Sequence, residues 1–300
     1  MTDNIWRGRD FLVLDGSMGQ MLKSRGVEIS RTIWSASALM TDPDIVRELH
    51  VEYLHAGADI LTTNNYACVP SCLVLDGIED RLDELVATSV QLACEARDQA
   101  SPYALIAGAL PPLSISYRPD VVLEPDEGVP IYSRIIAALG DDIDLLIAET
   151  MSSIAEAQMM ATAARASAKP LWLSWTLADD GSGKLRSGET VTEAFAALKD
   201  YDVAAWLFNC CVPKSIDVAL PELLALTGNP VGAYANAFLP VPEGWSLEAG
   251  GIETDHELDP WAYERHARHW LGNGARIIGG CCDIGPDHIA RIRALVPRAA

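Results

Sequence analysis

Eight short apolar segments, spread along the whole chain, most constrain how this sequence can fold. They are rich in Leu, Ile, Val, Ala and Trp with little polar alternation, and they cover residues 11–14, 58–61, 103–107, 144–148, 171–175, 204–208, 231–234 and 275–278. Segments of this kind are typical of parallel strands that are buried on both faces. The patterns between them predict amphipathic helices, among others over residues 43–56, 82–99 and 152–167.

The alternation of eight strands with helices predicts an α/β fold, a (β/α)8 TIM barrel. An open doubly wound sheet is the alternative, but the chain lacks the glycine-rich phosphate loop that would favour it. No linker or low-complexity tract divides the 300 residues, so we expect a single domain over residues 1–300. Residues 111–130 and 238–260 are expected to be long loops, which in compact domains are more often functional than accidental.

Polar or reactive side chains follow most of the apolar segments, where a core would not choose them. These strand ends read Asp15-Gly16-Ser17, Thr62-Thr63-Asn64-Asn65-Tyr66, Glu149-Thr150, Asn209-Cys210-Cys211, Asn236 and Gly279-Gly280-Cys281-Cys282. In a barrel the carboxyl ends of the strands converge on one face, where enzymes of this fold keep their active site. The sequence therefore predicts an active site at that face.

The charge of the chain excludes several classes of partner. Asp and Glu number 42 and Lys and Arg 22, which gives a formal charge of −20. Phosphate backbones and anionic membrane surfaces would repel such a chain, so we expect neither nucleic acid nor membrane as a partner. No apolar run reaches the roughly 18 residues of a membrane span, and residues 1–7 lack a secretion signal.

The seven cysteines point to a reducing compartment and to one reactive cluster. An odd count in a long chain argues against a disulfide framework, so we expect reduced thiols and a cytoplasmic protein. Cys68, Cys72 and Cys94 are interpreted as structural thiols. The sequence carries no signal for the oligomeric state.

Cys281 and Cys282 are adjacent at the last strand end, and the glycines around them allow the turn that both need to reach one metal ion. A third thiolate has to come from Cys210 or Cys211, and the residues alone leave that choice open. Three thiolates fit zinc, and three protein ligands leave a position free for a substrate. The alternative is a set of core thiols or a redox pair. Helical residues Glu264, His266 and His269, with His256 nearby, are interpreted as a solvated face, because they match no metal spacing.

Several blocks together resemble the homocysteine S-methyltransferase family over almost the whole chain. They are residues 14–22, 34–36, 50–66, 149–157, 173–176, 185–189, 209–210 and 279–289. The resemblance implies a zinc-dependent barrel in which Cys210, Cys281 and Cys282 hold Zn²⁺, with Cys210 preferred because the family cysteine directly follows Asn. Two stretches depart from the family, residues 108–113 and 234–238, and both lie near the expected methyl donor, so the departures concern the donor's identity.

The implied reaction transfers a methyl group from a sulfonium or ammonium donor to homocysteine and gives methionine. By the same resemblance Glu149 pairs with the ammonium group of homocysteine, and Asp15 and Gly16 belong to the substrate site. For either acid the alternative is a strand-end carboxylate that caps a helix. Thr63 and Asn64 are expected to donate hydrogen bonds to the substrate.

The methyl donor is expected to be a small cation. Trp34, Trp172 and Trp175 could form an aromatic face for it or could belong to the core. S-methylmethionine is favoured on residues 34–36, with S-adenosylmethionine, betaine and dimethylsulfoniopropionate as alternatives. Three alternative functions stay open: a subunit that activates homocysteine and works with a separate corrinoid protein, a selenocysteine methyltransferase, and a non-catalytic module that binds zinc or thiols.

Overall fold

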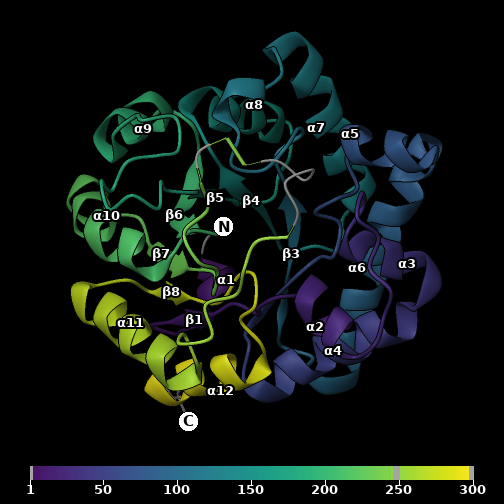
Figure 1. Cartoon of the computed structure of the whole chain (residues 1–300), viewed down its shortest axis with the longest axis horizontal. Helices are drawn as coiled ribbons and strands as arrows, with labels where there is room; N and C mark the ends of the chain where they lie inside the picture. Colours follow the sequence, from purple (N-terminus) through teal and green to yellow (C-terminus); the bar gives the residue numbers. More distant parts are fainter. Residues whose placement is uncertain (1–2, 243, 246–250, 297–300) are drawn as a thin grey trace.

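Eight parallel strands form one sheet in the order β1-β8-β7-β6-β5-β4-β3-β2 (Figure 1). The computed structural model describes residues 3–242, 244–245 and 251–296. The strands are β1 (Leu12–Val13), β2 (Ile60–Thr62), β3 (Leu105–Leu110), β4 (Leu145–Met151), β5 (Leu171–Trp175), β6 (Val203–Asn209), β7 (Val231–Tyr234) and β8 (Ile277–Ile278). A parallel bridge between Leu14 and Ile60 joins the two edges. The predicted (β/α)8 barrel is confirmed, with a strand at each of the eight apolar segments.

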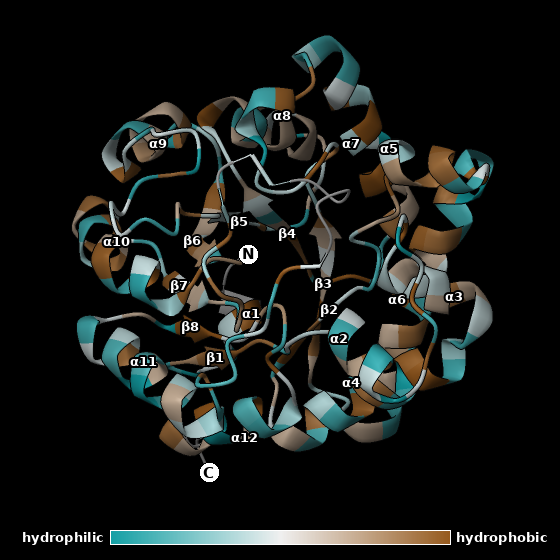
Figure 2. Ribbon diagram, in the orientation of Figure 1, coloured by the Kyte–Doolittle hydropathy of each residue, from teal (hydrophilic) through white to brown (hydrophobic). Residues whose placement is uncertain are grey.

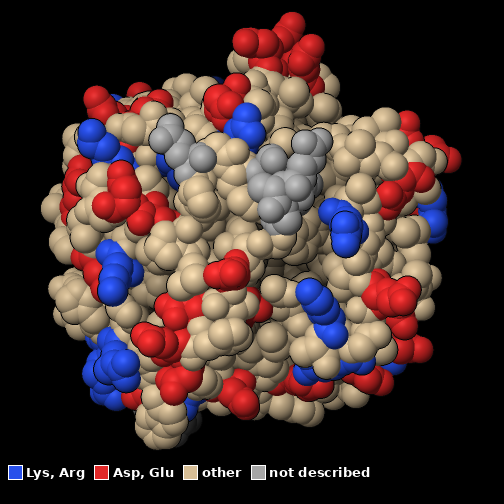
Figure 3. Space-filling model, viewed as in Figure 1, with Lys and Arg blue, Asp and Glu red and all other residues tan. Residues whose placement is uncertain are grey.

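Helices surround the barrel and turn their apolar faces toward it (Figure 2). The α-helices are α1 (Asp3–Trp6), α2 (Gly19–Ser24), α3 (Ala38–Thr41), α4 (Pro43–Ala56), α5 (Pro70–Leu73), α6 (Leu82–Ala100), α7 (Pro125–Leu139), α8 (Ile154–Ala164), α9 (Val191–Leu198), α10 (Pro213–Leu226), α11 (Pro260–Asn273) and α12 (Pro286–Leu295). Within the described residues, no helix is both long and apolar enough to cross a membrane. On the face in Figure 3, acidic and basic side chains are interspersed.

Sequence-based boundaries were wrong at the start of α7 and at both ends of α8, which ends at Ala164 and not at residue 167. Helix α7 begins at Pro125, inside the stretch expected to be a loop up to residue 130. Proline is well tolerated at the first helical position because its missing N–H has no partner there, and Asp126 and Glu127 stabilise the first turn. Helix α8 starts two residues later than expected because Ser153 caps it, accepting a hydrogen bond from the Glu156 amide.

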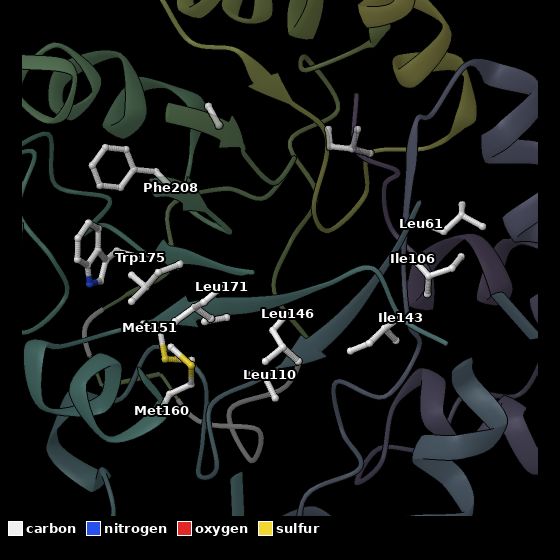
Figure 4. Packing of buried hydrophobic residues seen from close by; sticks show 14 of the residues in the cluster. Leu61, Ile106, Leu110, Ile143, Leu146, Met151, Met160, Leu171, Trp175 and Phe208 are labelled. Atoms are coloured by element: carbon white, nitrogen blue, oxygen red, sulfur yellow. The ribbon is translucent and has the colours of Figure 1, made fainter. Parts of the chain in front are cut away.

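The core has two layers. Inside the barrel, Leu12, Leu105 and Ile147 pack with Trp172, which is almost fully buried. Between the barrel and the helices lies a larger cluster, where Met151 of β4 and Met160 of α8 point toward one another (Figure 4).

A buried carboxyl group of α8 supports the loop that follows β4. Glu156 Oε2 accepts hydrogen bonds from the Ser152 amide at 2.7 Å and from its hydroxyl at 2.8 Å. Burial raises the pKa of Glu156 to about 7. Because the folded pKa exceeds the unfolded one, stability is lost as pH rises from about 4.5 towards 7.

We expect Glu156→Gln to flatten the pH dependence of stability. The glutamine carbonyl can accept the same hydrogen bonds but does not ionise, so the variant should avoid a loss of roughly 3 kcal/mol above pH 7. Thermal unfolding of both proteins at pH 5 and pH 8 measures this. Equal falls in midpoint for the two proteins would show that Glu156 does not titrate in this range.

Candidate metal centre and substrate cavity

The carboxyl ends of the strands surround a cavity of about 220 Å³. All eight residues that were predicted to bind the metal or the substrate line it: Asp15, Gly16, Thr63, Asn64, Glu149, Cys210, Cys281 and Cys282. These residues come from the ends of β1, β2, β4, β6 and β8. The fold therefore brings the predicted side chains together.

Three thiols form a compact cluster at one side of this cavity. Cys210 Sγ lies 3.6 Å from Cys282 Sγ, which lies 4.0 Å from Cys281 Sγ, and all three sulfurs are within 4.8 Å of one another. Thiolates about 2.3 Å from a tetrahedral zinc ion would be about 3.8 Å apart. The cluster thus has the dimensions needed to hold one metal ion.

Cys211 lies outside this cluster. Its side chain is fully buried in the layer between barrel and helices, where burial raises the pKa of its thiol well above the ordinary value. Cys210 instead takes a left-handed backbone conformation, with φ of 53°, as the chain leaves β6. This turn directs one thiol of the pair into the cavity and the other away from it.

Two glycines allow the cysteine loop to approach the first strand. A Cβ at Gly16 would lie 2.2 Å from the Ile284 carbonyl oxygen, and one at Gly280 would lie 2.0 Å from the Ile284 side chain. The Cys281 amide then donates to Ala235 O at 2.9 Å, which ties the loop to the end of β7. A larger residue at either glycine would displace the loop that carries two of the thiols.

The three thiols are electrostatically coupled. Hydrogen bonds from Cys281 and Cys282 hold the pKa of Cys210 well below its ordinary value, and the same contacts raise the pKa values of Cys281 and Cys282. A divalent ion would be needed to stabilise all three thiolates.

Asn209 links the strand end that carries Cys210 to the one that carries Glu149. Its Oδ1 accepts from the Thr150 amide at 2.8 Å and from the Ser174 hydroxyl at 2.7 Å, and its Nδ2 donates to Thr150 Oγ1 at 3.0 Å. Thr150 has φ of 62°, an uncommon conformation for a β-branched residue. The buried amide thus fixes the spacing between the thiol cluster and the neighbouring carboxyl group.

Two buried carboxyl groups face the cavity. Burial and the charge of Asp15 raise the pKa of Glu149 to about 8, and burial raises the pKa of Asp15 to about 7. Asp15 Oδ2 accepts a hydrogen bond from the Thr62 amide at 2.8 Å, which helps to close the barrel between β1 and β2. None of the described lining residues is Lys, Arg or His, so a cationic ligand would meet no basic side chain there and would favour the charged forms of both acids.

Thr63 and Asn64 line the cavity, but their side chains already have partners. Thr63 Oγ1 donates to Asn65 Oδ1 at 2.6 Å, and Asn64 Nδ2 donates to Ser35 O at 3.0 Å. Their hydroxyl and amide groups thus maintain the loop after β2.

Aromatic residues form much of the remaining wall: Trp34, Tyr66, Tyr117, Tyr234, Phe238 and Trp245. Of the three tryptophans considered for a donor face, only Trp34 reaches the cavity. Trp172 fills the barrel interior, and Trp175 stacks on Trp206 with ring centroids 5.2 Å apart. Trp172 and Trp175 therefore belong to the core.

The remaining candidates lie apart from the metal cluster. Cys72 lines the cavity wall but is not one of the three clustered thiols, whereas Cys68 is buried in the core and Cys94 is partly buried on α6. The interpretation of a solvated helical face was wrong for Glu264, which is buried and pairs with Arg268 and Arg291.

Sequence reasoning missed Tyr117 and His50 as neighbours of the site. The Tyr117 hydroxyl lies 2.9 Å from Cys210 Sγ although 93 residues separate them. His50 is fully buried on α4, and its Nδ1 lies 4.0 Å from Asp15 Oδ2. Neither contact has a local signal in the sequence, because each depends on how distant segments meet in the barrel.

The fold and this site define a (β/α)8-barrel enzyme with a three-cysteine candidate metal centre beside a buried acidic cavity. A sequence model described as homocysteine S-methyltransferase matches residues 12–296. The chain belongs to the homocysteine S-methyltransferase family and is a methyltransferase.

Individual relatives agree with this assignment. The homocysteine S-methyltransferase of Escherichia coli is 30% identical over 303 residues, covering 95% of each chain. The selenocysteine methyltransferase of Astragalus bisulcatus is 26% identical and covers 97% of this chain and 94% of its own. The structure of the metallated form of the homocysteine methyltransferase MmuM from Escherichia coli has a TM-score of 0.82 at 29% identity, covering 97% of this chain and 99% of that chain.

Proposed function

We propose that this enzyme transfers a methyl group from a small sulfonium or ammonium donor to homocysteine, giving methionine. The proposal depends on zinc held by Cys210, Cys281 and Cys282, and the observation that carries it is the spacing of their sulfurs at the edge of the acidic cavity. Thiolates are the ligands that a borderline-soft ion such as zinc prefers. The reducing conditions that keep these thiols free are those of the cytoplasm, where we expect the enzyme to act.

Bound zinc would lower the pKa of the homocysteine thiol, ordinarily about 8.5, and so keep it nucleophilic near pH 7. Glu149 would bind the substrate ammonium, since a cation returns this buried acid to its charged form. Asp15 lines the same cavity, where a bound ammonium group would favour its charged form, and Gly16 lines the cavity beside it. The residues thus hold the amino-acid end of the substrate while its sulfur lies at the metal centre.

The same cavity suits a cationic methyl donor. Aromatic faces attract onium groups. No described residue lining the cavity is basic, and the charge of a bound cation would favour the ionised forms of Asp15 and Glu149. S-methylmethionine is our first choice of donor, ahead of S-adenosylmethionine, betaine and dimethylsulfoniopropionate. In each case the cavity would stabilise the positive charge while the donor lies in line with the acceptor sulfur.

A panel of the four donors, each mixed with homocysteine and zinc-loaded enzyme, tests this proposal. We expect methionine, detected by mass spectrometry, with S-methylmethionine giving the highest rate. A panel without any product would contradict direct transfer, and methionine that forms only after a methylated corrinoid protein is added would indicate the homocysteine-activating subunit. A metal or thiol store would bind zinc and show no turnover with any donor.

Selenocysteine is the second candidate acceptor, and the similarity to a selenocysteine methyltransferase favours testing it. A selenolate suits the same zinc centre. Equal concentrations of homocysteine and selenocysteine should give mainly methionine if homocysteine is the physiological acceptor. A predominance of methylselenocysteine would reverse that assignment.

A further inference from the structure

The hydroxyl of Tyr117 contacts the candidate metal centre directly. It lies 2.9 Å from Cys210 Sγ, and both side chains are buried. In the described part of the chain, Tyr117 is the one side chain other than a cysteine that is hydrogen-bonded to a sulfur of the cluster. A metal-bound cysteine has lost its proton, so the tyrosine has to be the donor in the metal-loaded enzyme.

A buried ion pair, formed by Arg186 and Asp179, packs against the ring of Tyr117. The Arg186 guanidinium lies over the tyrosine ring, 4.4 Å from its centroid, and Arg186 Nη2 lies 2.7 Å from Asp179 Oδ2. The side chains of Arg186 and Asp179 are only 6% and 2% exposed. Tyr117 itself has φ of 67°, a strained conformation for this residue that its surroundings must maintain.

The same ion pair joins three loops around the cavity. Asp179 accepts hydrogen bonds from the Val212 amide at 2.9 Å and from the Val241 amide at 3.0 Å. Arg186 also donates to Val241 O at 3.3 Å. The segments after β5, β6 and β7 are therefore fixed relative to Tyr117, and the segment after β6 is the one that carries Cys210.

The metal-loaded cluster would carry a net negative charge that Tyr117 and Arg186 can partly offset. Three thiolates and one divalent cation leave a net charge of −1 by formal count, and the described cavity lining offers no Lys, Arg or His to offset it. The Tyr117 hydroxyl supplies a charge-assisted hydrogen bond to one thiolate, and Arg186 places a positive charge on the far face of the ring. Partners of this kind orient metal ligands and tune the electron density that they donate.

We propose that Tyr117, supported by Arg186, is a positioning residue that orients the Cys210 thiolate and withdraws charge from it. This inference rests on the metal centre of the proposed function. A thiolate that donates less charge leaves the metal a stronger Lewis acid toward a fourth ligand. Tyr117 would thus favour binding of the substrate thiol to the metal, and it would take no direct part in the transfer of the methyl group.

Tyr117→Phe and Tyr132→Phe form a matched pair of variants for the test. Tyr117→Phe removes the hydroxyl that is hydrogen-bonded to Cys210 Sγ and keeps the aromatic ring that packs against Arg186. The second removes a buried hydroxyl that donates to Pro111 O at 2.9 Å, in the segment that leads to Tyr117, so it loosens the same loop without touching a thiol. Each protein is loaded with Co²⁺, which reports thiolate ligation through its charge-transfer absorption, and Zn²⁺ affinity is measured by chelator competition.

We expect Tyr117→Phe to move the sulfur-to-cobalt band to lower energy, because an unbonded thiolate gives up its electrons more easily. Zinc affinity should fall about 10- to 100-fold in this variant. Tyr132→Phe should match the wild type in both measurements. An unchanged band and affinity in Tyr117→Phe, or equal changes in both variants, would overturn the inference. Failure of the wild-type protein itself to bind either metal would instead refute the metal centre of the proposed function.

Discussion

Cys281→Ala should remove bound zinc and methyl transfer together. The substitution deletes one of three thiols that lie within 4.8 Å of one another, and two thiols are too few to hold the ion firmly. Loss of a partner behind a metal ligand already costs about 10- to 100-fold, so loss of the ligand itself should reduce activity by more than about 100-fold. Metal analysis of purified protein and the methionine assay measure both effects, and Cys210→Ala and Cys282→Ala should behave alike.

Cys211→Ala is the matched control. It removes a thiol from the position next to Cys210, but this thiol points into the layer between barrel and helices. The variant should keep about one zinc ion per chain, with stability lowered by the small cavity. Zinc that is retained in Cys210→Ala and lost in Cys211→Ala would reverse the assignment of the first ligand.

Glu149→Gln should weaken homocysteine binding while leaving zinc content unchanged. Glutamine has nearly the same shape but no charge for the substrate ammonium, and a lost charge-assisted hydrogen bond costs about 1.5–3 kcal/mol. The Michaelis constant for homocysteine should therefore rise roughly 10- to 150-fold. Steady-state kinetics at saturating donor measure this change.

Glu156→Gln provides the control for this experiment, because it neutralises another buried acid outside the cavity. It should leave the Michaelis constant close to that of the wild type. An unaltered Michaelis constant in Glu149→Gln would place the ammonium anchor elsewhere, and Asp15 would be the next residue to replace.

The placement of the site was predictable because it depends on repeated local patterns. Each apolar segment is followed directly by its polar residues, and the parallel barrel has to bring these ends to one face. The side-chain roles at that face were less predictable. The structure shows the Thr63 hydroxyl donating to Asn65 and one N–H of the Asn64 amide donating to Ser35, while the second N–H of that amide is still able to donate, so the expected hydrogen bonds to a substrate stay a prediction.

The contacts behind the site were not predictable from local patterns. Tyr117 comes from the segment after β3, and Arg186 comes from the segment after β5. No spacing rule relates these residues to Cys210, since they meet through folded loops and not along one helix or strand. The start of α7 at Pro125 was not predicted because proline occurs both in loops and in the first turn of helices, so its presence did not distinguish the two.

The sequence by itself determined the barrel, the face that carries the site and the adjacent thiols of Cys281 and Cys282. Runs of consecutive apolar residues mark the buried strands, and the polar residues that follow mark their ends, so these features can be predicted without knowledge of distant contacts. The residue pattern alone left open which thiol of the Cys210–Cys211 pair faces the cavity, and only the family resemblance favoured Cys210. The tertiary structure decided it, because Cys210 lines the cavity whereas Cys211 is packed in the layer between barrel and helices. The tertiary structure also decided which polar groups remain available to a ligand. Some of these groups already have hydrogen-bond partners within the protein, and the two cavity acids are buried without a basic side chain in the described lining.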